Sequence, residues 1–469
     1  MDTQFFEDGN IATLGVESLP CQKVLTYQLN GIGDLPKVKV KDTLLDAILD
    51  SIYSSVFHQV LPIGSVKIKS IQHLNKPMSL AEGSNQSGYQ NHLAVKVKET
   101  SLSIKRFMKN AEQESMSAAD RRLEAFKIKQ SFLEINQYFQ SHERFVLFIN
   151  RSLANCAQQF AFCFVHRITH GNINNDALSI EGRWQNNNTS SFHNDFAENS
   201  FTSSSLNEQK DVALSLFLRW VCYYNSFNKT QIETSELSQY FYAIYNKYLE
   251  YYVVSVLGVS PDELPLNTLA RAELTSGLIK LYQHNASELD IAKFITQSLS
   301  DITKEGSASY KLLNSAITSE NQHYTPSSII TKWAIIGLRK VYFNALFQNN
   351  NIRQSLAIFL SKRKLDQVLE LSNHYEDCAA WLFEAKDSSV HTVIFSNKKL
   401  LIYFVPVTQS YVVEHFDKGH KYSFIDAKEL LLYIQTQPKL DFNLPGFLAW
   451  RGLIYMLTEL LELERGQLA

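Results

Sequence analysis

The stretch formed by residues 171–209 constrains the fold of this chain more than any other segment. It holds nine Asn and seven Ser, and it lies between two apolar, aromatic-rich regions. Nothing in it has the 3.6-residue period of a helix or the two-residue period of a strand. A structureless segment this long is uncommon inside a compact domain, and it is usually functional, ordered by a partner, or a linker. The sequence therefore predicts a long surface excursion that divides the chain.

Four aromatic residues stand alone within this polar stretch, and they are its candidate partner-binding residues. They are Trp184, Phe192, Phe196 and Phe201. Five acids and one base give the stretch a net charge of −4, so it is not itself a nucleic-acid surface. Isolated aromatics in polar surroundings are typical of a segment that orders by inserting rings into a groove. We expect a partner-binding arm if Trp184 reaches outward, and a long structural loop if it packs on its own chain.

The overall composition excludes several broad classes of protein. The 469 residues are enough for two or three domains, and the net charge of −2 gives no global attraction for nucleic acid or an anionic membrane. The five scattered cysteines indicate a reducing compartment. The first residues lack the features of a signal peptide, and the best candidate span, residues 145–168, carries polar groups too costly for a bilayer. We expect a cytoplasmic protein without membrane contact.

Periodicity predicts an α+β fold that is predominantly α. Residues 22–29, 65–71 and 93–98 have strand composition, and a helical stripe occupies residues 41–57. Helical patterns without a repeated consensus follow, and two β-hairpins within residues 390–425 precede the last helices. The expected segments are an α+β module with a basic tract (1–115), a helical segment (116–170), the polar insert (171–209), an irregular multi-helix domain (210–373) and a small α+β module with two hairpins (374–469).

A basic tract in residues 66–109 is a candidate binding surface. It carries eight basic residues and two acids, and alternating lysines on a strand beside a basic helix suit contact with phosphates. Alternating lysines on an edge strand also discourage aggregation, so that alternative stays open. A second cluster, residues 362–364, is expected in a helix. The candidate nucleic-acid contacts are Lys67, Lys69, Lys96, Lys98, Lys105, Arg106 and Lys109.

The end of this tract, KVKETSLSIKRFMKN (residues 96–110), resembles the strand-to-helix transition in RNA-binding backbone subunits of CRISPR complexes. The resemblance covers these residues only, and the long helical region of this chain does not belong to those folds. It implies an RNA-binding subunit of an RNA-guided nucleoprotein complex as one alternative function.

A second resemblance concerns HYEDCAAWLFEAKD, residues 374–387. An apolar strand that ends in Glu-x-Lys, with an acid upstream, is similar to the core of PD-(D/E)xK nucleases, although the Pro-Asp element is missing. That chemistry needs paired carboxylates on Mg²⁺ and a lysine near the attacking water. The resemblance implies Asp377, Glu384 and Lys386 as catalytic residues. A solvated, salt-bridging pair at the end of an element is the alternative.

Cys163, His166 and His170 have a spacing that would place all three on one helix face, where a thiolate and imidazoles suit zinc. The same segment alternates as a strand does, which would place Cys163 opposite His166. A fourth ligand would have to come from the polar stretch, so we expect no metal and no cofactor. The glycine-rich phosphate loops, the GxSxG elbow and the HExxH motif are also absent from the sequence.

The leading interpretation is a non-enzymatic cytoplasmic subunit of a larger assembly, with nucleic-acid contact through the basic tract as a further expectation. The expected partners are proteins of a multi-subunit assembly together with RNA or DNA. One alternative is a Mg²⁺-dependent nuclease of the PD-(D/E)xK type. The other is an RNA-binding subunit of an RNA-guided complex.

Overall fold

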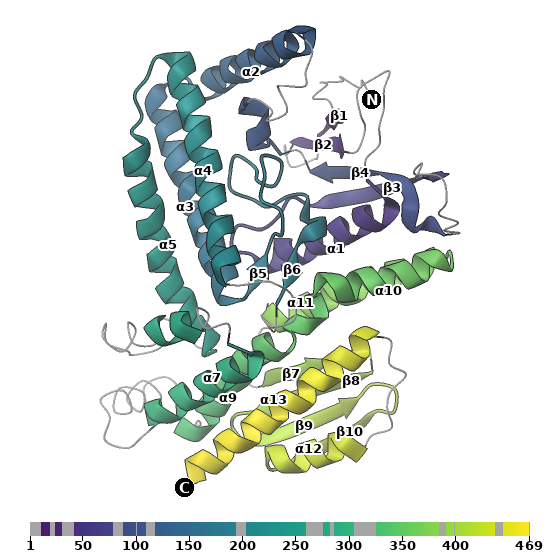
Figure 1. Cartoon of the computed structure of the whole chain (residues 1–469). Coiled ribbons are helices and arrows are strands. Elements are labelled where there is room, and N and C mark those ends of the chain that lie inside the picture. The colour runs from purple at the N-terminus through teal and green to yellow at the C-terminus, as the bar shows by residue number, and fades with distance from the viewer. Residues whose placement is uncertain are drawn as a thin grey trace.

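The chain folds into an α+β structure that is predominantly helical, as its periodicity predicts (Figure 1). It is known from a computed structural model. The structure describes residues 11–18, 24–30, 42–77, 88–99, 101–108, 118–193, 203–258, 275–281, 286–303, 325–383, 391–397, 399–436 and 444–468.

A four-stranded antiparallel sheet and one helix form the N-terminal part. The elements are β1 (Ile11–Ser18), β2 (Val24–Asn30), α1 (Leu44–Val60), β3 (Ile68–Pro77) and β4 (His92–Glu99). The sheet has the order β1-β2-β4-β3, and α1 packs against β3 and β4. The hydroxyl of Thr43 starts α1 by accepting a hydrogen bond from the backbone N–H of Asp46. These elements confirm the predicted helix and the predicted strands.

Four long helices stand beside this sheet, as Figure 1 shows. They are α2 (Ala118–Phe139), α3 (His142–Val165), α4 (Ser203–Asn228) and α5 (Thr234–Val256), and a two-stranded ribbon, β5 (Ile168–Thr169) with β6 (Ser191–Phe192), follows α3. The central helix α3 packs against both α4 and α5. The C-terminal end of the polar stretch was predicted as loop, and this is wrong, because α4 already begins at Ser203.

A second group of helices runs between this layer and the C-terminal module. The helices are α7 (Glu288–Thr303), α9 (Pro326–Tyr342), α10 (Asn349–Ser361) and α11 (Leu365–Phe383). Thr325 and Ser328 form a reciprocal capping box at the start of α9. The strand predicted within residues 374–387 is wrong, because residues up to 383 belong to α11. The buried residues of α11 include Leu371, Tyr375, Ala379 and Leu382, which have helical spacing.

The C-terminal module contains the two predicted hairpins. Its elements are β7 (Thr392–Ser396), β8 (Leu400–Val405), β9 (Ser410–His415), β10 (His420–Phe424), α12 (Ala427–Thr436) and α13 (Leu444–Leu468). The hairpins join through β8 and β9 into one antiparallel sheet of order β10-β9-β8-β7. The carboxylate of Glu464 on α13 accepts hydrogen bonds from the Tyr411 hydroxyl at 2.6 Å and from the Ala427 backbone N–H at 3.1 Å. These bonds fix α13 to both the sheet and α12.

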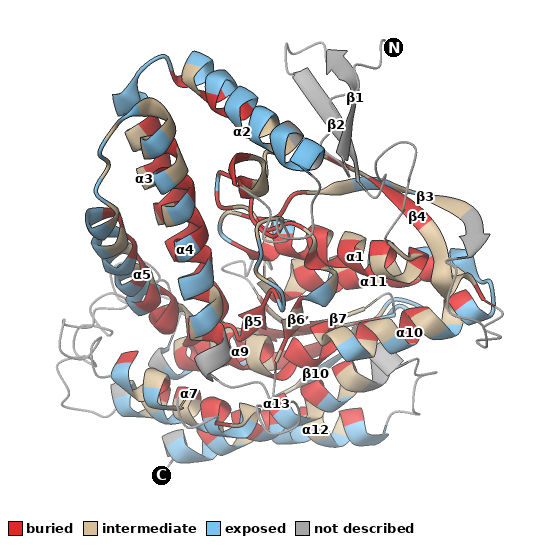
Figure 2. Ribbon diagram, turned by 45° about the horizontal axis from the view of Figure 1, so that its top comes forward, coloured by how far each residue is buried: buried red, intermediate tan, exposed pale blue. Residues whose placement is uncertain are grey.

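The N-terminal, central and C-terminal parts pack on one another. One continuous cluster of buried apolar residues extends from Leu44 to Leu463, and Figure 2 shows buried segments running through all three parts. The Tyr53 hydroxyl on α1 donates a 2.7 Å hydrogen bond to the Phe347 backbone oxygen, and α1 also packs against α11. The division of the chain into five segments stays a prediction.

Candidate functional site

The first half of the polar stretch, residues 171–193, folds back into the protein. The backbone oxygen of Trp184 accepts hydrogen bonds from the backbone N–H of Val66 and the hydroxyl of Ser65, both at 2.8 Å. The backbone N–H of Ile180 donates to the oxygen of Leu102 at 2.8 Å. Residues 171–193 are therefore bound by their backbone to the segments that flank the N-terminal sheet.

The aromatic anchors of this segment point inward. The Trp184 ring meets the Phe57 ring of α1 edge-on with centroids 5.3 Å apart, and the Phe192 ring stacks on Phe57 at 5.8 Å. Both side chains are fully buried, so neither reaches outward to a partner. These two residues therefore belong to a structural loop that packs on its own chain. Phe196 and Phe201 lie outside the described residues.

A buried ion pair joins this loop to the sheet and to α1. The ammonium group of Lys96 lies 2.6 Å from the Asp50 carboxylate and 3.0 Å from that of Asp42. The other oxygen of Asp50 accepts the backbone N–H of Asn187 at 2.6 Å. Burial alone would lower the pKa of Lys96, but the two carboxylates outweigh it and raise the pKa above its ordinary value. Lys96 therefore pairs with carboxylates inside the protein.

Lys98, two residues further along β4, is also buried. Its ammonium nitrogen lies 3.5 Å from the side-chain oxygen of Gln185, at the outer limit of a hydrogen bond. Burial and the positive charge of Lys96 lower the pKa of Lys98 to about 8. Residues i and i+2 of a strand lie on the same face of the sheet. The alternating lysines of β4 therefore both point into the protein, not toward a phosphate backbone at the surface.

The remaining cations of the basic tract lie closer to the surface, and most face carboxylates. Lys69 lies 3.3 Å from Glu99, Lys105 lies 2.8 Å from Asp176, and Arg106 lies 2.7 Å from Glu134. Lys67 is half-buried, and Lys109 is outside the described residues. The described part of the tract thus forms no continuous unpaired positive surface, and its contact with nucleic acid stays a prediction.

Of the three candidate nuclease residues, the structure describes Asp377. Asp377 lies on the helix α11, and Glu384 and Lys386 are outside the described residues. The assignment of these three residues as catalytic stays a prediction.

The three candidate zinc ligands lie in separate surroundings. Cys163 is in the last turn of α3, His166 caps that helix, and His170 follows β5 and places its Nε2 atom 2.9 Å from the Gln185 backbone oxygen. Burial raises the pKa of the Cys163 thiol, which disfavours the thiolate. Among the described residues, no three His, Cys, Asp or Glu side chains gather in a metal-binding arrangement.

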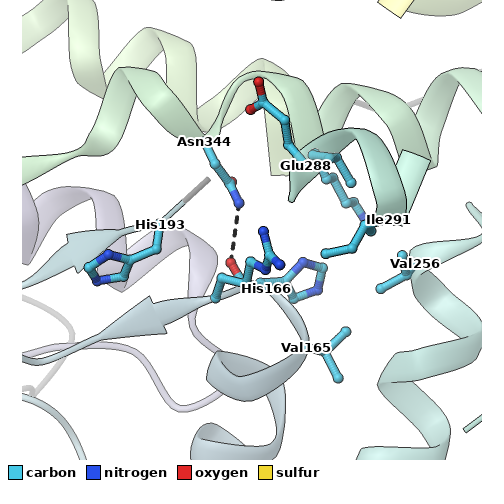
Figure 3. Close-up of a pocket in the computed structure, with 10 residues that line it drawn as sticks. Val165, His166, His193, Val256, Glu288, Ile291 and Asn344 are labelled. Atoms are coloured by element: carbon cyan, nitrogen blue, oxygen red, sulfur yellow. Dashed lines mark hydrogen bonds between the residues drawn. The ribbon is translucent and has the colours of Figure 1, made fainter. Parts of the chain in front are cut away.

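A pocket opens where α3, α5, α7 and α9 meet, and Figure 3 shows its lining. Its empty space, open mouth included, is about 350 Å³. Val165, His166 and Arg167 come from the end of α3. The Asn344 amide after α9 donates a 3.3 Å hydrogen bond to the His166 backbone oxygen. The full lining is Val165, His166, Arg167, His193, Val256, Glu288, Ile291, Lys340, Val341 and Asn344.

The pocket keeps its imidazoles neutral. Burial, reinforced by the charge of Lys340, holds the pKa of His166 well below its ordinary value. Burial and the charge of Arg167 lower the pKa of His193 to about 4. Sequence reasoning singled out His166 but missed Arg167, Lys340 and Asn344, since residues so distant in the chain give no local signal of proximity.

A basic turn joins α10 and α11 on the described surface. Residues 362–364 form this exposed turn, not the predicted helix, and no described carboxylate forms an ion pair with them. The Arg363 guanidinium lies 5.4 Å from the Tyr89 ring centroid. Beside Tyr89, the imidazoles of His73 and His92 approach to 2.8 Å. This turn is therefore a cationic edge next to a small aromatic cluster.

The chain matches no protein-family model and no curated protein. Within the described ranges, no helix is long and apolar enough to span a membrane.

The buried ion pair predicts a large stability difference between two acids of the same helix. Asp50→Ala would leave Lys96 buried with only Asp42 beside it, and we expect a loss of about 3–5 kcal/mol in the free energy of unfolding. The matched control is Asp46→Ala, which removes a part-exposed ion pair with Arg353 and a hydrogen bond from the Thr43 hydroxyl, and it should cost about 2 kcal/mol or less. Denaturant unfolding measures both. Equal losses of unfolding free energy in the two variants would contradict the buried position of the Asp50–Lys96 pair.

The lowered pKa of Lys98 predicts a pH dependence. Its folded pKa of about 8 lies below the ordinary value, so below pH 8 the cost of burying the charged form is fully present. As the pH rises, the folded state releases this proton first, and stability increases. Between pH 8 and pH 10 the wild type should gain about 2 kcal/mol relative to Lys98→Met, which lacks the titration. A constant difference across this range would show that Lys98 is not buried as described.

Proposed function

We propose that this chain is a non-enzymatic subunit of a larger cytoplasmic assembly and that α2 is the element by which it binds a protein partner. The observation that carries the proposal is the exposure of the first half of α2. In residues 118–130, none of the side chains whose burial is described is buried, although Phe126 is among them and is 58% exposed. A helix of marginal intrinsic stability usually depends on packing of its apolar face. In this half of α2, Ile128 packs partly buried against the core, whereas the ring of Phe126 stays exposed.

Two further apolar side chains of α2 and α3 are exposed. Tyr138 at the end of α2 is 78% exposed, and Leu147 on α3 is 68% exposed. Figure 2 shows α2 at the margin of the molecule with exposed residues along its length. The second half of α2 is anchored by Phe132, Ile135 and Phe139. The helix is thus held in place by its second half, while the rings of Phe126 in its first half and of Tyr138 near its end stay exposed, as in a docking element.

The cysteines support the cytoplasmic part of the proposal. Cys156, Cys163, Cys222 and Cys378 are free thiols, and Cys222 is exposed. Free thiols are typical of reducing compartments.

Contact with nucleic acid is a second part of the proposal, and we move it from the basic tract to the basic turn. Lys362, Arg363 and Lys364 are exposed neighbours without a described carboxylate partner, whereas Lys96 and Lys98 are buried. Unpaired cations displace counterions from a phosphate backbone, which favours binding at low salt. The RNA-guided alternative has one further support, because β4 is followed by the short helix η2 (Ile104–Phe107), in the order that the resemblance implies.

Purification of the tagged chain from its native host tests the proposal. We expect a stoichiometric protein partner with the wild type and at least about a fivefold lower yield of it with Phe126→Ser/Tyr138→Ser, because central aromatic contacts often contribute more than 1 kcal/mol each. The control is Leu432→Ser, which changes a residue 55% exposed on α12. Yields are compared by mass spectrometry.

Two outcomes would count against the proposal. A wild-type chain that is monomeric and brings no stoichiometric partner contradicts the assembly role. A partner retained by the α2 double variant contradicts the assignment to α2. The absorbance ratio at 260 and 280 nm of the same preparations reports nucleic acid, and a ratio typical of pure protein contradicts that second part.

A further inference from the structure

The pocket between α3, α5, α7 and α9 takes no part in the proposed contact with a protein partner. Its lining combines the end of α3, the residue after β6, the end of α5, the start of α7 and the end of α9. Segments far apart in the chain therefore converge there. Its empty space of about 350 Å³ includes the open mouth, so the enclosed part is smaller than this. A small ligand suits it better than a large one.

His166 is a buried polar group that faces this pocket. The residue is 5% exposed, and its Nε2 atom has no hydrogen-bond partner in the described part of the chain. Figure 3 shows the His166 ring among Val165, Val256 and Ile291, directed into the space that they enclose. Buried polar atoms are nearly always paired with protein, water or a ligand. The Nε2 atom is therefore a ready contact for a molecule in the pocket.

Two cationic side chains also line the pocket. Arg167 and Lys340 both line it, and their charges reach its imidazoles: Lys340 lowers the pKa of His166, and Arg167 lowers that of His193. Glu288 is the one acid among the lining residues, and Figure 3 shows its carboxylate directed away from the His166 ring. Counted over the lining residues alone, with both imidazoles neutral, two cations and one carboxylate carry one net positive charge, which suits an anion.

The backbone at Arg167 is held in a costly conformation. Its φ of 54° lies in the left-handed region, which costs a non-glycine residue roughly 1–2 kcal/mol. The His193 backbone N–H holds it there by donating a 3.0 Å hydrogen bond to the Arg167 oxygen, and the Arg167 guanidinium donates to the Ala286 oxygen. Such strain is found at ligand-binding positions more often than elsewhere. The geometry thus fixes Arg167 at the pocket wall.

We propose that this pocket binds a small oxyanion of the size of phosphate, with Lys340 and Arg167 supplying positive charge and His166 donating from Nε2. His166 acts as a neutral donor, so the ion need not bring a proton. Sulfate should bind in the same way, since it presents the same tetrahedral set of acceptor oxygens, whereas chloride offers none. Charge-assisted hydrogen bonds of this kind are stronger than neutral ones.

Calorimetric titration of the full chain with inorganic phosphate tests this proposal, with chloride at the same ionic strength as the reference. We expect saturable binding of phosphate and of sulfate and no comparable heat from chloride. Lys340→Met should weaken phosphate binding about tenfold or more, because a hydrogen bond to a charged group is lost. Lys332→Met is the matched control on the same helix α9, where Lys332 is likewise half-buried but outside the pocket lining, and it should bind as the wild type does.

Nuclear magnetic resonance of the histidine rings in the wild type provides a measurement that no variant's folding can compromise. The ring signals of His166 should shift during the phosphate titration with the same dissociation constant as the calorimetry. Equal heats for phosphate and chloride, or unmoved His166 signals, would overturn the proposal. An equal loss of binding in Lys332→Met and Lys340→Met would overturn the placement of the site.

Discussion

The ion pair between Asp50 and Lys96 is the interaction on which the arrangement of the N-terminal half depends. One partner lies on α1 and the other on β4, and the backbone of Asn187 in the loop bonds to the same carboxylate. A buried charge without its partner costs several kcal/mol, so helix, strand and loop must all reach their places for this site to be satisfied. The Asn187 side chain adds bonds to Ser54 and Ser65, at 3.2 and 2.8 Å. The network therefore sets the register of three segments at once.

The loop formed by residues 171–193 also contacts the segments around α10. Phe192 stacks on Phe57 of α1 and lies 5.0 Å, between ring centroids, from Phe347, which precedes α10. The Asn349 side chain donates to the backbone oxygens of Asn188 and Ser190 at 3.0 and 2.9 Å. The segment that looks like a spacer in the sequence thus lies between the N-terminal sheet and the central helices, and it pairs the polar groups of both.

Local periodicity was sufficient to predict most of the elements. The strand at 93–98, the helix over 41–57 and the two C-terminal hairpins all lie where their patterns place them. The failures share one physical cause, which is that polarity alone does not report exposure. Asn187, Ser190 and Gln185 are buried because the fold supplies partners from distant segments, and no local pattern encodes those partners.

The candidate sites show the same limit. Lys96 and Lys98 have the composition of a phosphate-binding strand, yet Asp50, which turns that face inward, lies on another element. In the sequence, Trp184 is surrounded by polar residues, as a partner-binding anchor is. In the structure it is fully buried, as a core residue is. In contrast, the basic turn at 362–364 and the unburied half of α2 could be placed only after the packing of α10, α11 and α3 was known. The pocket could not be predicted at all, because Arg167 and Lys340 become neighbours only through the convergence of α3 and α9.

Hydrogen–deuterium exchange of the isolated chain is the measurement that tests this account most directly. The amides of Ser179, Gln185 and Asn187 donate to Arg183, Ala177 and Asp50 inside the protein. Peptides covering residues 176–187 should therefore exchange as slowly as peptides from α1 and far more slowly than the exposed turn at 417–419. Exchange of residues 176–187 as fast as that turn, without any partner present, would show that the loop is not part of the core and would contradict the account.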